Sequence, residues 1–151
     1  MDYPVSNKAP DVAQAVVPHV LDGDGNAVPQ SPAAPQPVGN AELATATATI
    51  ANGESLSAAV DLGTGRLAGI VMPAAWTAAN LTFQTSPDGV TWRDRYDWLG
   101  GEVTVVAAAS RSIQVNLADW LGVRFLKVRS GTSGTPVNQG AERVLTLVLV
   151  R

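Results

Sequence analysis

The sequence contains no cysteine and only one histidine, His19, so the side chains that most often carry redox, nucleophilic and metal chemistry are almost missing. The lack of thiols excludes disulfides, iron–sulfur ligation and cysteine catalysis. His19 follows Pro18 in a proline-rich segment, and such a segment does not hold a histidine rigidly beside an activated serine and a carboxylate. We therefore expect no catalytic residue, no metal site and no cofactor.

Charge is also scarce. Charged residues make up 15% of the chain, against roughly 25% in an ordinary soluble domain, and the net charge is −3. The sequence has no basic patch that would attract nucleic acid. No stretch approaches the ~18 consecutive apolar residues of a membrane span, and residues 1–4 lack the basic and then apolar pattern of a signal peptide. We expect neither nucleic acid nor a membrane as a partner.

Proline is concentrated at the N-terminus, where seven of the ten prolines lie within the first 40 residues. That segment also carries one lysine and four aspartates, whereas residues 41–151 hold nine basic and nine acidic side chains. Each proline removes an amide donor, and the run from Pro29 to Pro37 is typical of a polyproline-like linker. We expect residues 1–40 to form an extended N-terminal anchoring arm with a linker, and residues 41–151 to form a folded body.

Within the arm, residues 22–26 place oxygen-bearing side chains at alternate positions, like the start of a calcium loop. A calcium hand then needs glycine at its sixth position and glutamate at its twelfth, and here Ala27 and Ala33 stand there. The segment is better interpreted as a tight turn that joins residues 20–21 to residues 27–28 in a small hairpin.

From residue 41 onward the dominant period is two, and turn residues punctuate it every few positions. No window keeps a helical period. The pattern predicts an all-β fold, an antiparallel β-sandwich that is either jelly-roll-like or immunoglobulin-like. The expected strands cover residues 44–49, 55–62, 66–72, 81–85, 90–98, 102–107, 112–117, 123–129 and 143–150.

The last expected strand, residues 143–150, is apolar on both faces. Either both faces are covered within the body, or the second face lies in an interface between subunits.

The expected strand at 90–98 has a largely aromatic face, which we interpret as core, with a platform for stacking sugars as the alternative. Asp94 and Asp97 point to opposite faces of that strand, which argues against a paired-carboxylate glycosidase site. The aromatic face is formed by Val90, Trp92, Asp94, Tyr96 and Trp98.

Residues 85–92, Thr-Ser-Pro-Asp-Gly-Val-Thr-Trp, resemble the Ser-x-Asp-Gly-x-Thr-Trp hairpin of jelly-roll, discoidin-like and sialidase-repeat β proteins. In the sialidase repeat one more residue separates the aspartate from the glycine. The resemblance implies a structural turn, in which Asp88 holds the backbone, Gly89 turns the chain and Trp92 packs beneath it.

A wider resemblance is to virion proteins of tailed bacteriophages, including head decoration (cement) proteins and the bases of head fibres or spikes. The resemblance spans about residues 41–151 and implies no catalytic residue. The arm resembles the anchoring termini of such proteins in composition alone. The segments that carry the resemblance are residues 50–57, 69–76, 86–92, 129–132 and 136–139.

This resemblance implies a non-enzymatic structural protein that decorates and stabilises a phage capsid and is anchored through its arm. The implied partners are the major capsid protein or other virion subunits, together with further copies of the chain, with a trimer expected. The implied location is the capsid surface, after synthesis in the host cytoplasm.

The alternative is a carbohydrate- or receptor-binding module of a head fibre or tail fibre, with Trp76, Trp98 and Trp120 as stacking residues. The exposure of the aromatic rings discriminates between the two functions, because a sugar binder needs at least two coplanar aromatic rings in solvent and a cement protein buries them.

Overall fold

The computed structural model describes residues 19–21, 24–25, 27–29 and 41–151. The chain separates into two compact units, Met1–Asn40 and Ala41–Arg151. The second unit is the body.

In the first unit, β1 (His19–Leu21) pairs with β2 (Ala27–Pro29) as an antiparallel hairpin. The register joins His19 to Pro29 and Leu21 to Ala27. The expected small hairpin is therefore confirmed. The expected extended arm and the linker beyond Pro29 fall on residues outside the described ones.

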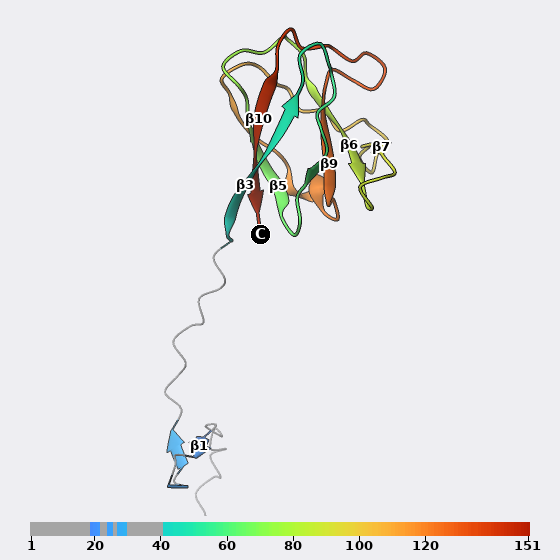
Figure 1. The fold of residues 1–151 in the computed structure, drawn as a ribbon. Helices are drawn as coiled ribbons and strands as arrows, with labels where there is room; N and C mark the ends of the chain where they lie inside the picture. Colours follow the sequence, from blue (N-terminus) through green and yellow to red (C-terminus); the bar gives the residue numbers. More distant parts are fainter. Residues whose placement is uncertain (1–18, 22–23, 26, 30–40) are drawn as a thin grey trace, which may run out of the picture. The chain divides into compact units, whose positions relative to one another are not determined.

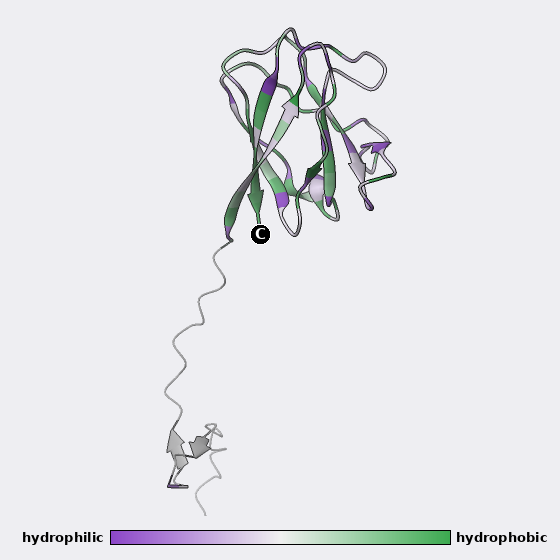
Figure 2. Cartoon of the chain, viewed as in Figure 1, coloured by the Kyte–Doolittle hydropathy of each residue, from purple (hydrophilic) through white to green (hydrophobic). Residues whose placement is uncertain are grey.

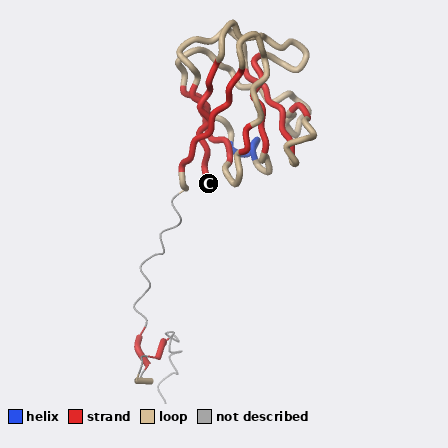
Figure 3. The backbone as a smooth tube through the Cα atoms, viewed as in Figure 1, coloured by secondary structure: helices blue, strands red, loops and turns tan. Residues whose placement is uncertain are grey.

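The body is all-β, as the period-two pattern predicts, and contains two antiparallel four-stranded sheets (Figures 1 and 3). The order is β3-β10-β5-β8 in the first sheet and β4-β9-β6-β7 in the second. The first sheet consists of β3 (Leu43–Ile50), β5 (Arg66–Val71), β8 (Ser112–Gln114) and β10 (Arg143–Val150). The second consists of β4 (Val60–Asp61), β6 (Leu81–Ser86), β7 (Arg93–Asp94) and β9 (Phe125–Ser130).

Strand β10 lies between β3 and β5, and its side chains alternate between two environments. Leu145, Leu147 and Leu149 are buried, whereas Val144 is 45% exposed and Val148 is half-buried. The expectation that both faces of β10 are covered within the body is therefore wrong for the residues that the structure describes. The face that carries Val144 and Val148 is partly exposed to solvent.

Buried side chains from both sheets form one hydrophobic cluster, and Figure 2 shows apolar residues running along β10 and β5. Burial of this apolar surface is the main favourable contribution to folding. Phe83 of β6 meets Trp120 edge to face, with ring centroids 4.7 Å apart and planes at 84°. Trp120 belongs to the 3-10 helix η1 (Leu117–Trp120), which thus closes part of the core.

The expected strand at 55–62 is reduced to β4 and a single bridge between Leu56 and Arg129. The cause is Ser57, whose backbone N–H donates to Val128 O (2.8 Å) while its Oγ accepts from Val128 N (2.9 Å). A hydroxyl thereby replaces a backbone carbonyl in the ladder.

The expected strand at 112–117 ends at Gln114, and η1 follows. The Asn116 side chain accepts from Ala118 N (3.3 Å), which caps the helix and ends the alternation. Residues 102–107 form isolated bridges with residues 81 and 96 instead of a continuous strand.

Candidate functional site

The turn after β6 is organised by Asp88. Its Oδ1 accepts from Thr91 N (2.7 Å), Val90 N (2.8 Å) and Ser86 Oγ (2.7 Å). The Thr91 amide, the Val90 amide and the Ser86 hydroxyl stabilise the carboxylate charge, in that order, and hold the pKa of Asp88 well below its ordinary value of 3.8. Gly89 has φ +75°, a left-handed conformation that suits glycine.

Trp92, the third residue of the expected structural turn, is half-buried. The Lys127 Nζ lies over its ring, 4.4 Å from the ring centroid, in a cation–π contact. The ring face of Trp92 that Lys127 covers is therefore occupied by the protein's own side chain.

The interpretation of residues 90–98 as one strand with a core-facing aromatic side is wrong. Only β7 is a strand, and Val90 is 80%, Tyr96 51% and Trp98 89% exposed. Asp88 captures the amides of residues 90 and 91, and Asp97 captures those of residues 99 and 101. The chain therefore leaves strand geometry on both sides of β7.

The three tryptophans proposed for sugar stacking lie in three different environments. Trp120 is 1% exposed in the core and cannot contact a ligand in solvent. Trp76 is half-buried, and its Nε1 donates to Ala79 O (3.0 Å). Trp98 is almost fully exposed, so it alone of these three offers most of its ring to a ligand.

Trp98 lies in a second turn built around an aspartate. The Asp97 Oδ1 accepts from Gly101 N (2.8 Å) and Leu99 N (2.9 Å), and the Asp97 amide donates to Gly101 O (2.8 Å). Gly100 has φ +86°, which closes the turn. These bonds fix the backbone that carries the exposed ring.

One hollow lies beside this turn, and a second hollow adjoins the first. The aromatic pocket, of about 160 Å³, lies between the turn and η1. The long groove, of about 330 Å³, runs between residues 103–106 and residues 113–116. Val103 and Asp119 line both hollows. The aromatic pocket is lined by Arg95, Tyr96, Asp97, Trp98, Val103, Ala118 and Asp119.

Arg95 joins the two sides of the aromatic pocket. Its guanidinium Nη2 donates to the carbonyl oxygen of Asp119 (2.7 Å), which ties η1 to the segment after β7. Its Nε is buried and has no partner among the described residues. Arg95 thus brings a guanidinium group to the wall of the pocket.

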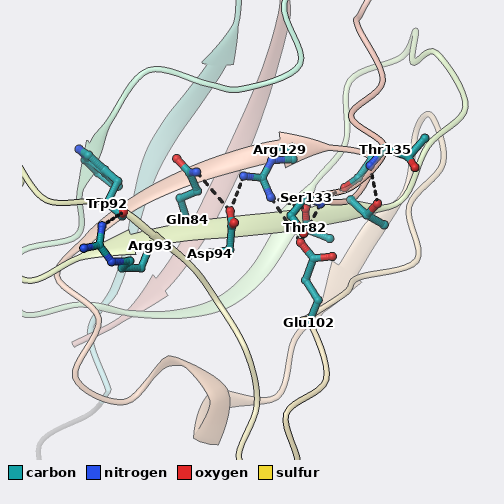
Figure 4. A network of polar contacts seen from close by, with 11 residues as sticks. Thr82, Gln84, Trp92, Arg93, Asp94, Glu102, Arg129, Ser133 and Thr135 are labelled. Carbon is teal, nitrogen blue, oxygen red and sulfur yellow. Dashed lines mark hydrogen bonds and ion pairs between the residues drawn. The ribbon is translucent and has the colours of Figure 1, made fainter.

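Residues on either side of this turn belong to a largely buried ionic cluster that the sequence analysis did not anticipate (Figure 4). Arg129 of β9, with its side chain 9% exposed, pairs with Asp94 of β7 and with Glu102 (3.3 Å). Gln84 also donates to Asp94 (3.2 Å), and Ser133 N donates to Glu102 Oε1 (2.9 Å). The hydrogen bond from Arg129 is the main reason why the pKa of Asp94 lies below its ordinary value.

The cluster holds both ends of the second turn, because Asp94 precedes residues 97–101 and Glu102 follows them. No local signal predicts it: Arg129 is 35 positions from Asp94 and 27 from Glu102.

In the part of the chain that the structure describes, no group of three or more histidine, cysteine, aspartate or glutamate side chains is placed to hold a metal ion. In that same part, no helix has the length and apolarity to cross a membrane. No protein-family model matches the chain, and no curated protein matches its sequence.

Proposed function

We propose that the protein is a non-enzymatic structural protein of a tailed-phage virion, whose body is a jelly-roll β-sandwich that decorates and stabilises the capsid. Residues 1–40 attach the body to the major capsid protein or to another virion subunit. The observation that carries the proposal is the strand pairing of the body, together with the resemblance of residues 41–151 to virion proteins.

The pairing is nested. The first of the eight body strands pairs with the last, β3 with β10, and the second with the seventh, β4 with β9. The pairs β5–β8 and β6–β7 complete the series, and successive pairs alternate between the two sheets. This is the winding of one long antiparallel ribbon rolled around a core, which favours a jelly roll over an immunoglobulin-like sandwich. Viral capsid domains and lectins both use jelly rolls.

The first sheet also offers a surface for contact between copies. Leu147 is fully buried, so it belongs to the core and not to an interface. The opposite face combines the threonines of β3 with Val144, Val148 and Val150 of β10, and residues 43–50 carry no charge. The uncharged stretch formed by β3 and the adjoining valines of β10 suits a contact between identical subunits. We assign this face to the trimer.

The alternative function, a carbohydrate- or receptor-binding module of a fibre, is favoured by one observation. Tyr96 and Trp98 are both exposed at the aromatic pocket.

The test is attachment to particles. A variant of residues 41–151 should remain folded, because the body has its own core, and should no longer bind particles purified without the protein. The full chain should restore density on the head in an electron cryomicroscopy map, in clusters of three. Equal occupancy by the truncated variant, or particles that never carry the chain, would show the proposal to be wrong.

A further inference from the structure

The aromatic pocket and the long groove have features that capsid attachment does not explain. Trp98 is 89% and Tyr96 51% exposed, on a turn whose backbone is fixed. Leaving large aromatic rings in water forfeits the free energy of burying them, and adjoining exposed aromatics mark binding surfaces. Both residues line the same hollow.

We propose that this region binds a neutral oligosaccharide. The apolar face of a pyranose ring packs on Trp98 and Tyr96, and the chain of sugars continues into the long groove. The proposal goes beyond capsid decoration and does not depend on it: a decorating body can carry a saccharide site on its exposed turn.

The polar groups of the pocket suit hydroxyl ligands. The Asp119 carboxylate makes no hydrogen bond or ion pair with any described residue, so both of its oxygens can accept from sugar hydroxyls. The Asp97 Oδ2 has no partner in the described part of the chain either, because the turn uses Oδ1. Arg95 also lines the pocket, and its Nη2 is held by the Asp119 carbonyl oxygen. Planar carboxylates and guanidinium groups form directional, charge-assisted hydrogen bonds.

The charges of the pocket select the class of saccharide. Two acidic residues and one basic residue line the pocket, so an acidic sugar would meet net repulsion, whereas a neutral sugar can hydrogen-bond to the same groups. The long groove adds the amides of Gln114 and Asn116 and the exposed apolar side chain of Val106. Its volume of about 330 Å³ falls within the range of ligand sites.

The site is also preorganised. Arg129 holds Asp94 and Glu102 on either side of the turn, and Asp97 holds the turn itself. A rigid platform loses little conformational entropy when a ligand binds.

The test uses the full chain and an array of neutral di- to tetrasaccharides of glucose, galactose, mannose, rhamnose and N-acetylglucosamine, with sialylated and uronic-acid probes beside them. We expect at least one neutral probe to bind and the acidic probes to be rejected. Calorimetry on the best probe should show Trp98→Ala weakening the affinity about tenfold or more, as loss of an aromatic anchor does. Asp119→Asn should also weaken it.

Leu99→Ala is the matched control, because Leu99 is 74% exposed in the same turn and does not line the pocket. It should bind like the parent, and all three variants should keep the parent melting temperature. Failure of every neutral probe to bind, or equal losses in Trp98→Ala and Leu99→Ala, would overturn the proposal. It would also be overturned if Trp98→Ala reduced attachment to particles without any saccharide binding. Particle attachment through residues 1–40 is measured separately, so either proposal can fail alone.

Discussion

Two turns of the body are built by the same local chemistry. In the first, Asp88 Oδ1 accepts the amides two and three residues later; in the second, Asp97 Oδ1 accepts the amides two and four residues later. A glycine with positive φ lies in each turn, Gly89 in the first and Gly100 in the second. In both turns an aspartate accepts nearby amides and a glycine with positive φ lets the chain reverse.

The aromatic neighbours of the two turns nevertheless have different roles. Trp92 lies under Lys127 and is half-buried, whereas Trp98 lies in solvent beside a pocket. The difference comes from the elements that surround each turn: β9 supplies the lysine at the first, and η1 forms the opposite wall of the pocket at the second. Local sequence makes the turn, and the neighbouring elements decide whether its aromatic side chain is covered or exposed.

The largest loss of stability is expected when the ion pairs on either side of the second turn are removed. Arg129→Met leaves Asp94 and Glu102 without their common cation in a mostly buried position. Removing one partner from a buried ion pair costs about 3–5 kcal/mol, and solvent lowers the cost here because the Asp94 side chain is 32% exposed. We expect the free energy of unfolding, measured by urea denaturation, to fall by about 2–3 kcal/mol.

Arg124→Met is the matched control, because Arg124 pairs with Asp61 on the surface, with side chains 60% and 47% exposed. Surface pairs contribute roughly 0–1 kcal/mol. If the two variants lose equal stability, the buried cluster does not support the second turn.

Replacing the tryptophan beside each turn should produce stability changes of intermediate size. Trp92→Ala removes a half-buried ring and its contact with Lys127, so we expect a loss of about 1–2 kcal/mol, less than the 3–5 kcal/mol of a fully buried tryptophan. Trp98→Ala should change the stability by less than about 0.5 kcal/mol, because the ring is exposed. Thermal unfolding of both variants measures the difference, and equal losses would contradict the distinct roles of the two rings.

The smallest expected effect is a pH dependence at the first turn. The folded state holds the pKa of Asp88 below 3.8, so the carboxylate stabilises the fold above that pH and loses this contribution as the pH falls through the lowered value. Asp88→Asn keeps an oxygen that can accept the same amides but does not titrate.

Its free energy of unfolding should therefore decline less steeply than that of the parent between about pH 5 and pH 2. Asp61 and Asp94, whose pKa values are also lowered, should keep part of the acid sensitivity in both proteins. Parallel pH profiles for the two proteins would show that Asp88 does not contribute.

The long strands were predictable because their signal is local. The alternation of residues 43–50 and 143–150 and the turn residues around 66–71 and 81–86 place these strands within about two residues of their observed bounds. The shortened strands were not predicted, because side chains of Ser57, Asp88 and Asp97 capture backbone groups that alternation alone assigns to a ladder.

By itself, the sequence determined the all-β class, the hairpin of the first unit, the turn at Asp88 and the scarcity of chemically reactive side chains. These features depend on residue type and on neighbours within a few positions. Only the tertiary structure decided that Trp120 is core, that Trp98 is exposed at a pocket, and that Arg129 binds two carboxylates. Those outcomes depend on contacts between residues 27 or more positions apart or on the order of strands in the sheets. Neither the hydrophobic period nor the composition of a segment specifies which distant segments it will contact.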